Sequence, residues 1–232
     1  MSAPEGLPRG AFLWEKVRSR WRGWQRSGAS ARVLDWVRHG VPCYWNELGP
    51  PAPFHMGTSL GETSPAEQRW LLKEEARCVG SGAWRRVDRV RFCSRVFLVE
   101  KAGWDSDLQM RKKRLVIDLR PLNLHMQEFK TRYETLSQLG TLIADGETCA
   151  FLSFDLADAY ACLQIRPEFQ QYFGFNIQGR LYEMQALPFG WSVSPYAFCT
   201  AMKVLVRLLR SPDLPSVSQQ QREQEQPDGA VA

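Results

Sequence analysis

Two aspartates three residues apart have the clearest capacity for chemistry in this sequence. They lie in SFDLADAY (153–160), where the apolar run FLSFDL (151–156) predicts a buried strand that delivers Asp155 near its end, with Asp158 following. A carboxylate at a strand end can leave the core and bind a divalent cation, because such cations prefer hard oxygen ligands. An aspartate at such a point is also a common turn or cap residue, so this segment alone leaves both interpretations open.

Two further motifs flank these aspartates and favour the metal-binding interpretation over the turn or cap interpretation. RLVIDLRPLN (114–123) lies upstream, and LPFGWSVSPYAF (187–198) lies downstream. In this order and at these spacings, the three motifs resemble those of reverse transcriptases from retroviruses and retrotransposons. The residues of LPFGWSVSPYAF and the long Trp-rich leader are most similar to those of DIRS-like and related retrotransposons. The resemblance runs from about residue 30 to residue 210.

The resemblance implies a role for each residue around the two aspartates. Asp155 matches the first catalytic aspartate, which holds two Mg²⁺ ions, and Leu156 would add its backbone carbonyl as a ligand. Such metals activate the primer 3′ hydroxyl and stabilise the leaving pyrophosphate. The backbone amides of Asp158 and Ala159 would approach the triphosphate. Tyr160 matches the bulky residue that collides with a ribose 2′ hydroxyl, although it is also interpretable as an ordinary core aromatic.

The basic residues upstream match the nucleotide-binding part of the fingers. Arg114 matches the arginine that lies against the incoming nucleotide, since a planar guanidinium can stack on a base and bind phosphate together. Lys101 matches the lysine near the γ-phosphate. Lys112 and Lys113 remain alternatives, because the turn predicted at 102–113 is longer than the family's short turn. A solvated hairpin tip is the competing interpretation of this basic run.

The downstream loop completes the residues that the resemblance assigns, and a separate polar set has a structural interpretation. Phe189 and Gly190 would line the nucleotide pocket beside the template base, where glycine permits close backbone approach. Asp118, Arg120 and Asn123 are interpreted as a buried polar set that ties fingers to palm.

The elements that must position these residues follow from periodicity and end signals. Residues 64–79 predict a helix with Ser64 as N-cap and Pro65 in its first turn. Two hairpins are predicted, one from 90–101 and 114–119 and one from 172–177 and 180–185 around Gln178-Gly179. A last helix is predicted over 195–210, with Ser194 as N-cap. The extended stretch 41–65 is rich in Pro and Gly.

Positive charge is concentrated on the predicted folded part of this chain of formal net charge +5. Residues 111–120 carry five Lys or Arg against Asp118, and 9–26 carry six against Glu15. We therefore predict nucleic-acid contacts by basic residues of the hairpin and the last helix: Lys112, Lys113, Lys203, Arg207 and Arg210. The Trp-rich helix predicted over 11–26 either docks its aromatic face on the core or stacks on nucleic acid.

Composition excludes several classes. A hydrophobic content of 44% excludes a wholly disordered chain. No apolar stretch is long enough to span a membrane, and the N-terminus lacks an apolar signal core, which favours an intracellular protein of the cytoplasm or nucleus. The cysteines form no CxxC pair, so a structural zinc site is not predicted.

The resemblance implies an α+β fold, the fingers and partial palm of a right-hand polymerase with an incomplete antiparallel palm sheet. We divide the chain into a leader (1–63), a partial reverse transcriptase region (64–210) and a disordered tail (211–232). Primed RNA or DNA template and deoxynucleoside triphosphates are the expected partners, with Mg²⁺ as cofactor. The family's Tyr-x-Asp-Asp-like hairpin is not found after residue 210, which predicts a truncated and inactive chain. The alternative is a non-catalytic nucleic-acid-binding remnant of a mobile element.

Overall fold

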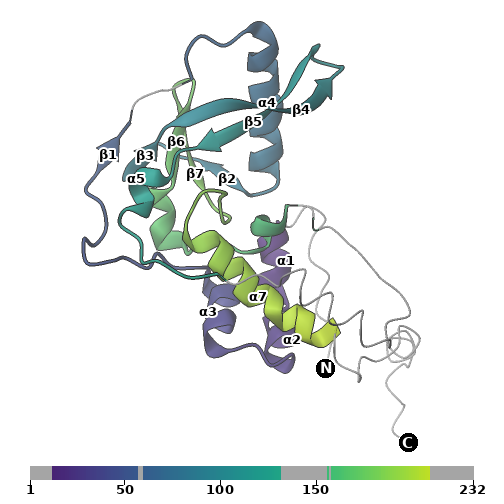
Figure 1. The fold of residues 1–232 in the computed structure, drawn as a ribbon, viewed down its shortest axis with the longest axis vertical. Coiled ribbons are helices and arrows are strands. Elements are labelled where there is room, and N and C mark those ends of the chain that lie inside the picture. The colour runs from purple at the N-terminus through teal and green to yellow at the C-terminus, as the bar shows by residue number, and fades with distance from the viewer. Residues whose placement is uncertain (1–11, 57–59, 132–155, 157, 210–232) are drawn as a thin grey trace, which may run out of the picture.

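The structure, a computed structural model, describes residues 12–56, 60–131, 156 and 158–209 (Figure 1). A mixed sheet, a separate two-stranded hairpin and a long helix form one end, and a group of helices forms the other. The helices are α1 (Leu13–Ser19), α2 (Trp21–Arg26), α3 (Ala31–His39), α4 (Pro65–Gly80), α5 (Arg120–Asn123) and α7 (Val193–Leu209), with short 3₁₀ helices η1 (Ala159–Cys162) and η2 (Pro167–Tyr172). The strands are β1 (Phe54–His55), β2 (Trp84–Arg86), β3 (Phe92–Ser94), β4 (Val96–Asp105), β5 (Met110–Ile117), β6 (Gly174–Ile177) and β7 (Arg180–Met184).

The sheet has five strands in the order β1-β3-β6-β7-β2. The pairs β6–β7 and β2–β7 are antiparallel, whereas β1–β3 and β3–β6 are parallel, so the described sheet is mixed. Parallel pairing requires a long connection, and β3 and β6 are indeed separated by most of the middle of the chain. The α+β composition agrees with the prediction. The palm strand predicted over 151–156 lies outside the described residues except for Leu156.

The hairpin β6–β7 confirms the turn signal at Gln178-Gly179. Both residues have positive φ, 49° and 83°, as a type I′ turn requires. The Asn176 side chain accepts a hydrogen bond of 2.8 Å from the Gly179 amide, which fixes the turn locally. Inward-facing residues of these strands, among them Phe175 and Tyr182, are fully buried and form the centre of the core.

The hairpin β4–β5 differs from its prediction in length. The residues expected to form a polar turn at 102–113 mostly continue the two strands, and the turn itself lies between Asp105 and Met110. Asp105 stabilises it by accepting hydrogen bonds from the amides of Asp107 and Leu108, both 3.1 Å. Residues 102–105 and 111–112, which extend the two strands, are exposed or half-buried and need no alternation of apolar residues, which is why periodicity did not show them. Likewise, the single strand predicted at 90–101 is divided between β3 and β4.

The structure confirms the signals predicted for the start of helix α4. Ser64 accepts a hydrogen bond from the Glu67 amide at 3.2 Å, and the Glu67 carboxylate accepts one from the Ser64 amide at 2.9 Å. This reciprocal pair is a capping box, with Pro65 in the first turn. Leu71 and Cys78 are buried against the core. The helix therefore has a defined start and one defined inward face.

The Trp-rich leader forms two short helices, α1 and α2, where one helix was predicted; the chain changes direction at Arg20. Trp14 is buried and donates its indole N–H to the Gly82 carbonyl at 3.2 Å. Trp21 and Trp24 are half-buried against the core. The structure thus confirms the core-docking interpretation of this face. Helix α3 follows and buries Val33, Trp36 and Val37.

Helix α7 begins earlier than predicted, at Val193. Ser194 does not cap it: its hydroxyl is buried and donates to the Pro188 carbonyl at 2.8 Å. The hydroxyl therefore anchors the loop that precedes the helix. The Ser-Pro sequence is compatible with Ser194 either as the N-cap or within the first turn of the helix. The hydrogen bond to Pro188 selects the second position.

The close packing around β6 gives a test of this arrangement. A Cβ at buried Gly174 would lie 2.6 Å from the Val90 side chain and 2.7 Å from the Phe92 carbonyl oxygen. Gly174→Ala is therefore expected to lower the free energy of unfolding by about 1–3 kcal/mol in a urea titration. Gly23→Ala in α2 is the control, because its Cβ would meet nothing within 4 Å. An equal effect of the two substitutions would contradict the register of β3 and β6.

Candidate active site

Three aromatic side chains meet where the motifs at 153–160 and 187–198 come together. The Tyr160 ring of η1 lies 4.7 Å from the Phe189 ring and 5.3 Å from the Phe198 ring on α7, measured between centroids. Tyr160 is half-buried, whereas Phe189 is 77% exposed. The structure therefore brings together two residues that the sequence assigned to one nucleotide pocket. The three rings therefore form a cluster in which Phe189 is the exposed member.

The loop that carries Phe189 is held by Asn123 of α5. The Asn123 amide donates to the Gly190 carbonyl at 2.7 Å, and its oxygen accepts from the Ser192 amide at 3.0 Å. Gly190 has a φ of 91°, a conformation that side chains rarely adopt. The loop thus has a fixed shape beside the end of β5, where the Ile117 carbonyl oxygen lies 3.8 Å from a Cβ built on Gly190.

The polar set predicted at Asp118, Arg120 and Asn123 is only partly buried. Asn123 does join two distant segments, as predicted. Arg120, however, is on the surface and forms a local pair with Asp118 at 2.8 Å. Hydrogen bonds from this guanidinium lower the pKa of Asp118. The prediction of burial was wrong for Arg120, because its partner lies only two residues away and the pair needs no interior.

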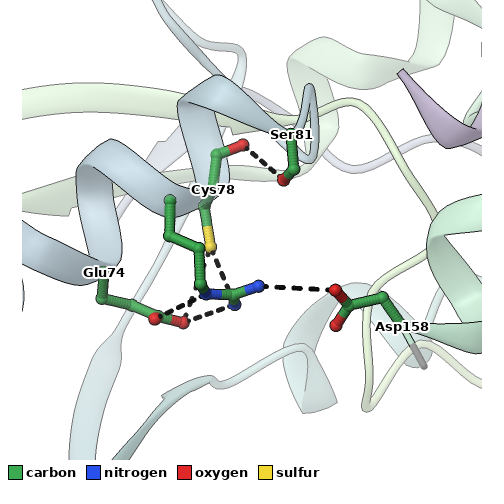
Figure 2. A network of polar contacts seen from close by, with 5 residues as sticks. Glu74, Cys78, Ser81 and Asp158 are labelled. Atoms are coloured by element: carbon green, nitrogen blue, oxygen red, sulfur yellow. Dashed lines mark hydrogen bonds and ion pairs between the residues drawn. The ribbon is translucent and has the colours of Figure 1, made fainter. Parts of the chain in front are cut away.

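Asp158 lies in a left-handed conformation, with φ 50° and ψ 41°, immediately before η1. Its carboxylate pairs with Arg77 of α4 at 3.6 Å, and Arg77 in turn binds Glu74 through two hydrogen bonds of 2.7 and 2.9 Å (Figure 2). The hydrogen bond to Glu74 raises the pKa of Arg77. Burial by itself would raise the pKa of Glu74, but the contact with Arg77 outweighs burial and leaves that pKa lowered. Helix α4 thus contacts the backbone segment predicted to approach a triphosphate.

The two faces of the hairpin β4–β5 separate the predicted nucleotide-binding cations. Arg114 and Lys112 lie on the exposed face. Opposite Lys112, the ladder is interrupted between Glu100 and Trp104, and this irregularity contains Lys101. Three cations predicted to bind nucleotide or nucleic acid therefore lie near one another on an exposed ribbon.

Lys113 points the other way, toward α4. Its ammonium lies 3.1 Å from Glu67 and 3.5 Å from Glu100, and its side chain is only 15% exposed. The contact with Glu67 raises the pKa of Lys113, and hydrogen bonds first from Ser64 and then from Lys113 lower the pKa of Glu67. Of the two alternatives to Lys101, Lys112 is the accessible one, whereas Lys113 holds the hairpin on α4.

The expected metal site cannot be placed, because Asp155 lies outside the described residues. Leu156, the second expected ligand, is 48% exposed. Among the described residues, no group of three or more His, Cys, Asp or Glu side chains could hold a metal ion. Ala159 is half-buried at the start of η1.

On α7, Lys203 and Arg207 are both exposed, one turn apart, as the predicted basic stripe requires. Arg210, its third member, lies outside the described residues. Among the helices that the structure describes, none is long and apolar enough to cross a membrane.

Comparison of the sequence with known protein families shows which family the chain belongs to. Residues 99–217, half of the chain, match the family model described as reverse transcriptase (RNA-dependent DNA polymerase). The chain belongs to the reverse transcriptase family. The match begins within β4 and includes β5, η1, the Phe189 loop and α7, whereas the α4 residues that contact them precede it.

The chain is also similar to a solved viral structure. It matches the protease–reverse transcriptase of prototype foamy virus with a TM-score of 0.53 and 18% sequence identity, over 87% of this chain. At that identity the likeness shows the fold alone, and it agrees with the predicted partial right-hand polymerase. The chain spans 27% of the viral protein's chain.

Sequence reasoning missed the residues of α4 that contact the candidate site. Glu67 was recognisable as a cap partner, but nothing marked it as the partner of Lys113. Arg77 carried no signal, because its partner Asp158 is 81 residues away. Both contacts depend on how α4 is placed on the sheet, which no local pattern specifies.

The Glu67–Lys113 pair predicts a pH-dependent stability. The pKa of Glu67 lies below its ordinary 4.5, so its contribution exists above that pH and disappears as the pH falls through the lowered folded-state value. The pKa of Lys113 is raised from 10.5, so its contribution exists below that pH and is lost on alkaline titration through the raised value. Glu67→Gln, which retains the capping box, should cost about 1 kcal/mol near neutral pH.

Urea unfolding near neutral pH and at about pH 3 measures this difference, which should disappear in acid. Glu62→Gln is the control, because Glu62 is exposed and forms no ion pair with another described residue. A loss for Glu67→Gln that persists unchanged in acid would show that the substitution acts through something other than the ion pair.

Proposed function

We propose that this reverse transcriptase is the fingers and upper palm of a retrotransposon polymerase, similar to DIRS-like elements, and that its function is RNA-templated DNA synthesis. The observation that carries the proposal is the contact between Tyr160 and Phe189. The family resemblance assigns both residues to the nucleotide pocket from two separate motifs, and their rings lie 4.7 Å apart, with Phe189 77% exposed. In this interpretation, Phe189 and Gly190 lie beside the template base.

The polypeptide's own side chains then divide the work of nucleotide binding. Arg114 stacks on the incoming nucleotide, and Lys101 or Lys112 binds its phosphates from the same exposed ribbon. The amides of Asp158 and Ala159 approach the triphosphate, in a segment contacted by Arg77. Tyr160 excludes the ribose 2′ hydroxyl. Lys203 and Arg207 contact nucleic acid through its phosphates.

Asp155 and the carbonyl of Leu156 are proposed to hold Mg²⁺, which would activate the primer hydroxyl and stabilise pyrophosphate departure. A second fixed carboxylate is needed, since two divalent cations in one small site require more than one anionic ligand. The printed sequence after residue 210 contains Asp213 and Asp228 but no Tyr-x-Asp-Asp-like segment. We infer that this 232-residue polypeptide, by itself, binds nucleic acid without extending a primer.

Primer extension on an RNA template with Mg²⁺ tests this proposal. The polypeptide alone should give no product above background. A version continued after residue 209 with the palm hairpin and thumb of a related polymerase should extend the primer, and Asp155→Asn should reduce its rate by on the order of 10²–10³ or more. An extended version that is folded yet inactive, or insensitive to Asp155→Asn, would remove Asp155 from the catalytic role.

The same extended version tests Tyr160. Tyr160→Ala should increase ribonucleotide incorporation relative to deoxyribonucleotide by on the order of tenfold or more, because the ring no longer occupies the space of the 2′ hydroxyl. Tyr160→Phe is the matched control and should retain discrimination, because it keeps the ring and loses only the hydroxyl. Unchanged selectivity in Tyr160→Ala would leave Tyr160 as a core aromatic.

A further inference from the structure

Helices α1–α3 carry an exposed positive surface that the proposed active site does not use. All Lys and Arg residues of this stretch are exposed: Lys16, Arg18, Arg20, Arg22, Arg26, Arg32 and Arg38. Its two acids are engaged elsewhere. Glu15 accepts a hydrogen bond from the Phe12 amide, and Asp35 pairs with Arg166. None of the seven cations forms an ion pair with another residue that the structure describes.

Three of these guanidinium groups are held in place by tryptophan rings. Arg18 lies over Trp14 at 5.0 Å, and Arg22 and Arg38 both lie over Trp21, at 5.4 and 4.6 Å from its centroid. Stacking on an indole fixes the plane of a guanidinium but leaves its N–H edge able to donate to an oxyanion. Two like charges from α2 and α3 thus converge on one ring without a carboxylate between them, an arrangement that a bound phosphate would stabilise.

The surface continues toward α7. Helix α2, the preceding Arg20 and helix α7 line a small open groove of about 130 Å³, which includes Trp24, Val204 and Leu205. Lys203 and Arg207 are exposed on the same α7. Figure 1 shows α1, α2, α3 and α7 together at the end of the molecule away from the hairpin β4–β5. The leader cations therefore form a site separate from the cations of the fingers.

We propose that α1–α3 form a second nucleic-acid contact, which binds the phosphate backbone of a duplex without reading its sequence. A single strand is disfavoured, because such sites need exposed aromatic rings for base stacking, whereas Trp14 is buried and Trp21 and Trp24 pack against the core. A membrane surface is disfavoured as well. In the described part of α1–α3, Leu13 is the one large hydrophobic side chain that is exposed.

Binding of the 232-residue protein to fluorescent duplex RNA and duplex DNA of unrelated sequence tests the proposal. Arg22→Glu/Arg38→Glu should lower affinity for both by on the order of tenfold or more and reduce the slope of log K against log salt by about 2. The matched control is Arg69→Glu/Arg89→Glu, which makes the same change in net charge at exposed positions of α4 and the β2–β3 connection. Equal losses in the two double variants would overturn the proposal.

A second variant guards against loss of the fold. Lys16→Glu/Arg26→Glu lies on the same helices but disturbs no tryptophan contact, and it should weaken duplex binding similarly while the circular dichroism spectrum stays unchanged. A folded Lys16→Glu/Arg26→Glu protein with undiminished duplex affinity would overturn the proposal. So would leader-dependent binding to phosphatidylserine vesicles, combined with duplex affinity that does not depend on the leader.

A hairpin variant separates this inference from the proposed polymerase function. Lys112→Glu removes a cation of the fingers and leaves α1–α3 intact. If the leader variants lose affinity, the inference stands whether or not Lys112→Glu has an effect. If Lys112→Glu alone loses affinity, the second contact is refuted while the proposed polymerase function remains.

Discussion

The position of α4 on the sheet is the constraint on which the candidate site depends. The Glu75 carboxylate of this helix accepts a hydrogen bond from the hydroxyl of buried Tyr182 and pairs with Arg180 at 2.8 Å. Burial first, and then this carboxylate, raises the pKa of Tyr182 to about 12, so the phenol remains a donor across the physiological range. Loss of one partner from such a pair leaves a charge without compensation. The contact therefore fixes the position of α4 along the sheet and the face that α4 turns toward it.

Once α4 is fixed, its two ends place the two halves of the proposed nucleotide site. Glu67, near the start, holds the hairpin through Lys113, and Arg77, near the end, contacts Asp158. Ten residues of helix set these contacts about 15 Å apart. Because a helix of this length is rigid, the exposed ribbon and the segment before η1 keep a constant separation. Asn123 adds the third connection, from the end of the hairpin to the Phe189 loop.

Sequence alone could predict what is encoded locally. The Ser64 N-cap and the Gln178-Gly179 turn were predicted because their hydrogen bonds connect neighbours in the chain. Family resemblance assigned both Tyr160 and Phe189 to the nucleotide pocket, but the contact between their rings was not predicted and no periodicity encodes it. The inward direction of Lys113 could not be predicted. It precedes three consecutive apolar residues, 115–117, so no alternation marks which face of the strand is covered. The role of Arg77 could not be predicted either, since it depends on the rotation of α4.

The leader shows why an aromatic and basic pattern leaves its own interpretation open. Sequence offered two uses for the tryptophans, docking on the core or stacking on nucleic acid, as if each ring had one task. In the structure, Trp14 is buried and donates to Gly82, yet it also carries the Arg18 guanidinium. Trp21 packs on the core and carries two guanidinium groups. Packing on the core fixes the orientation of each indole ring. The ring in turn fixes the position of the guanidinium that stacks on its exposed side.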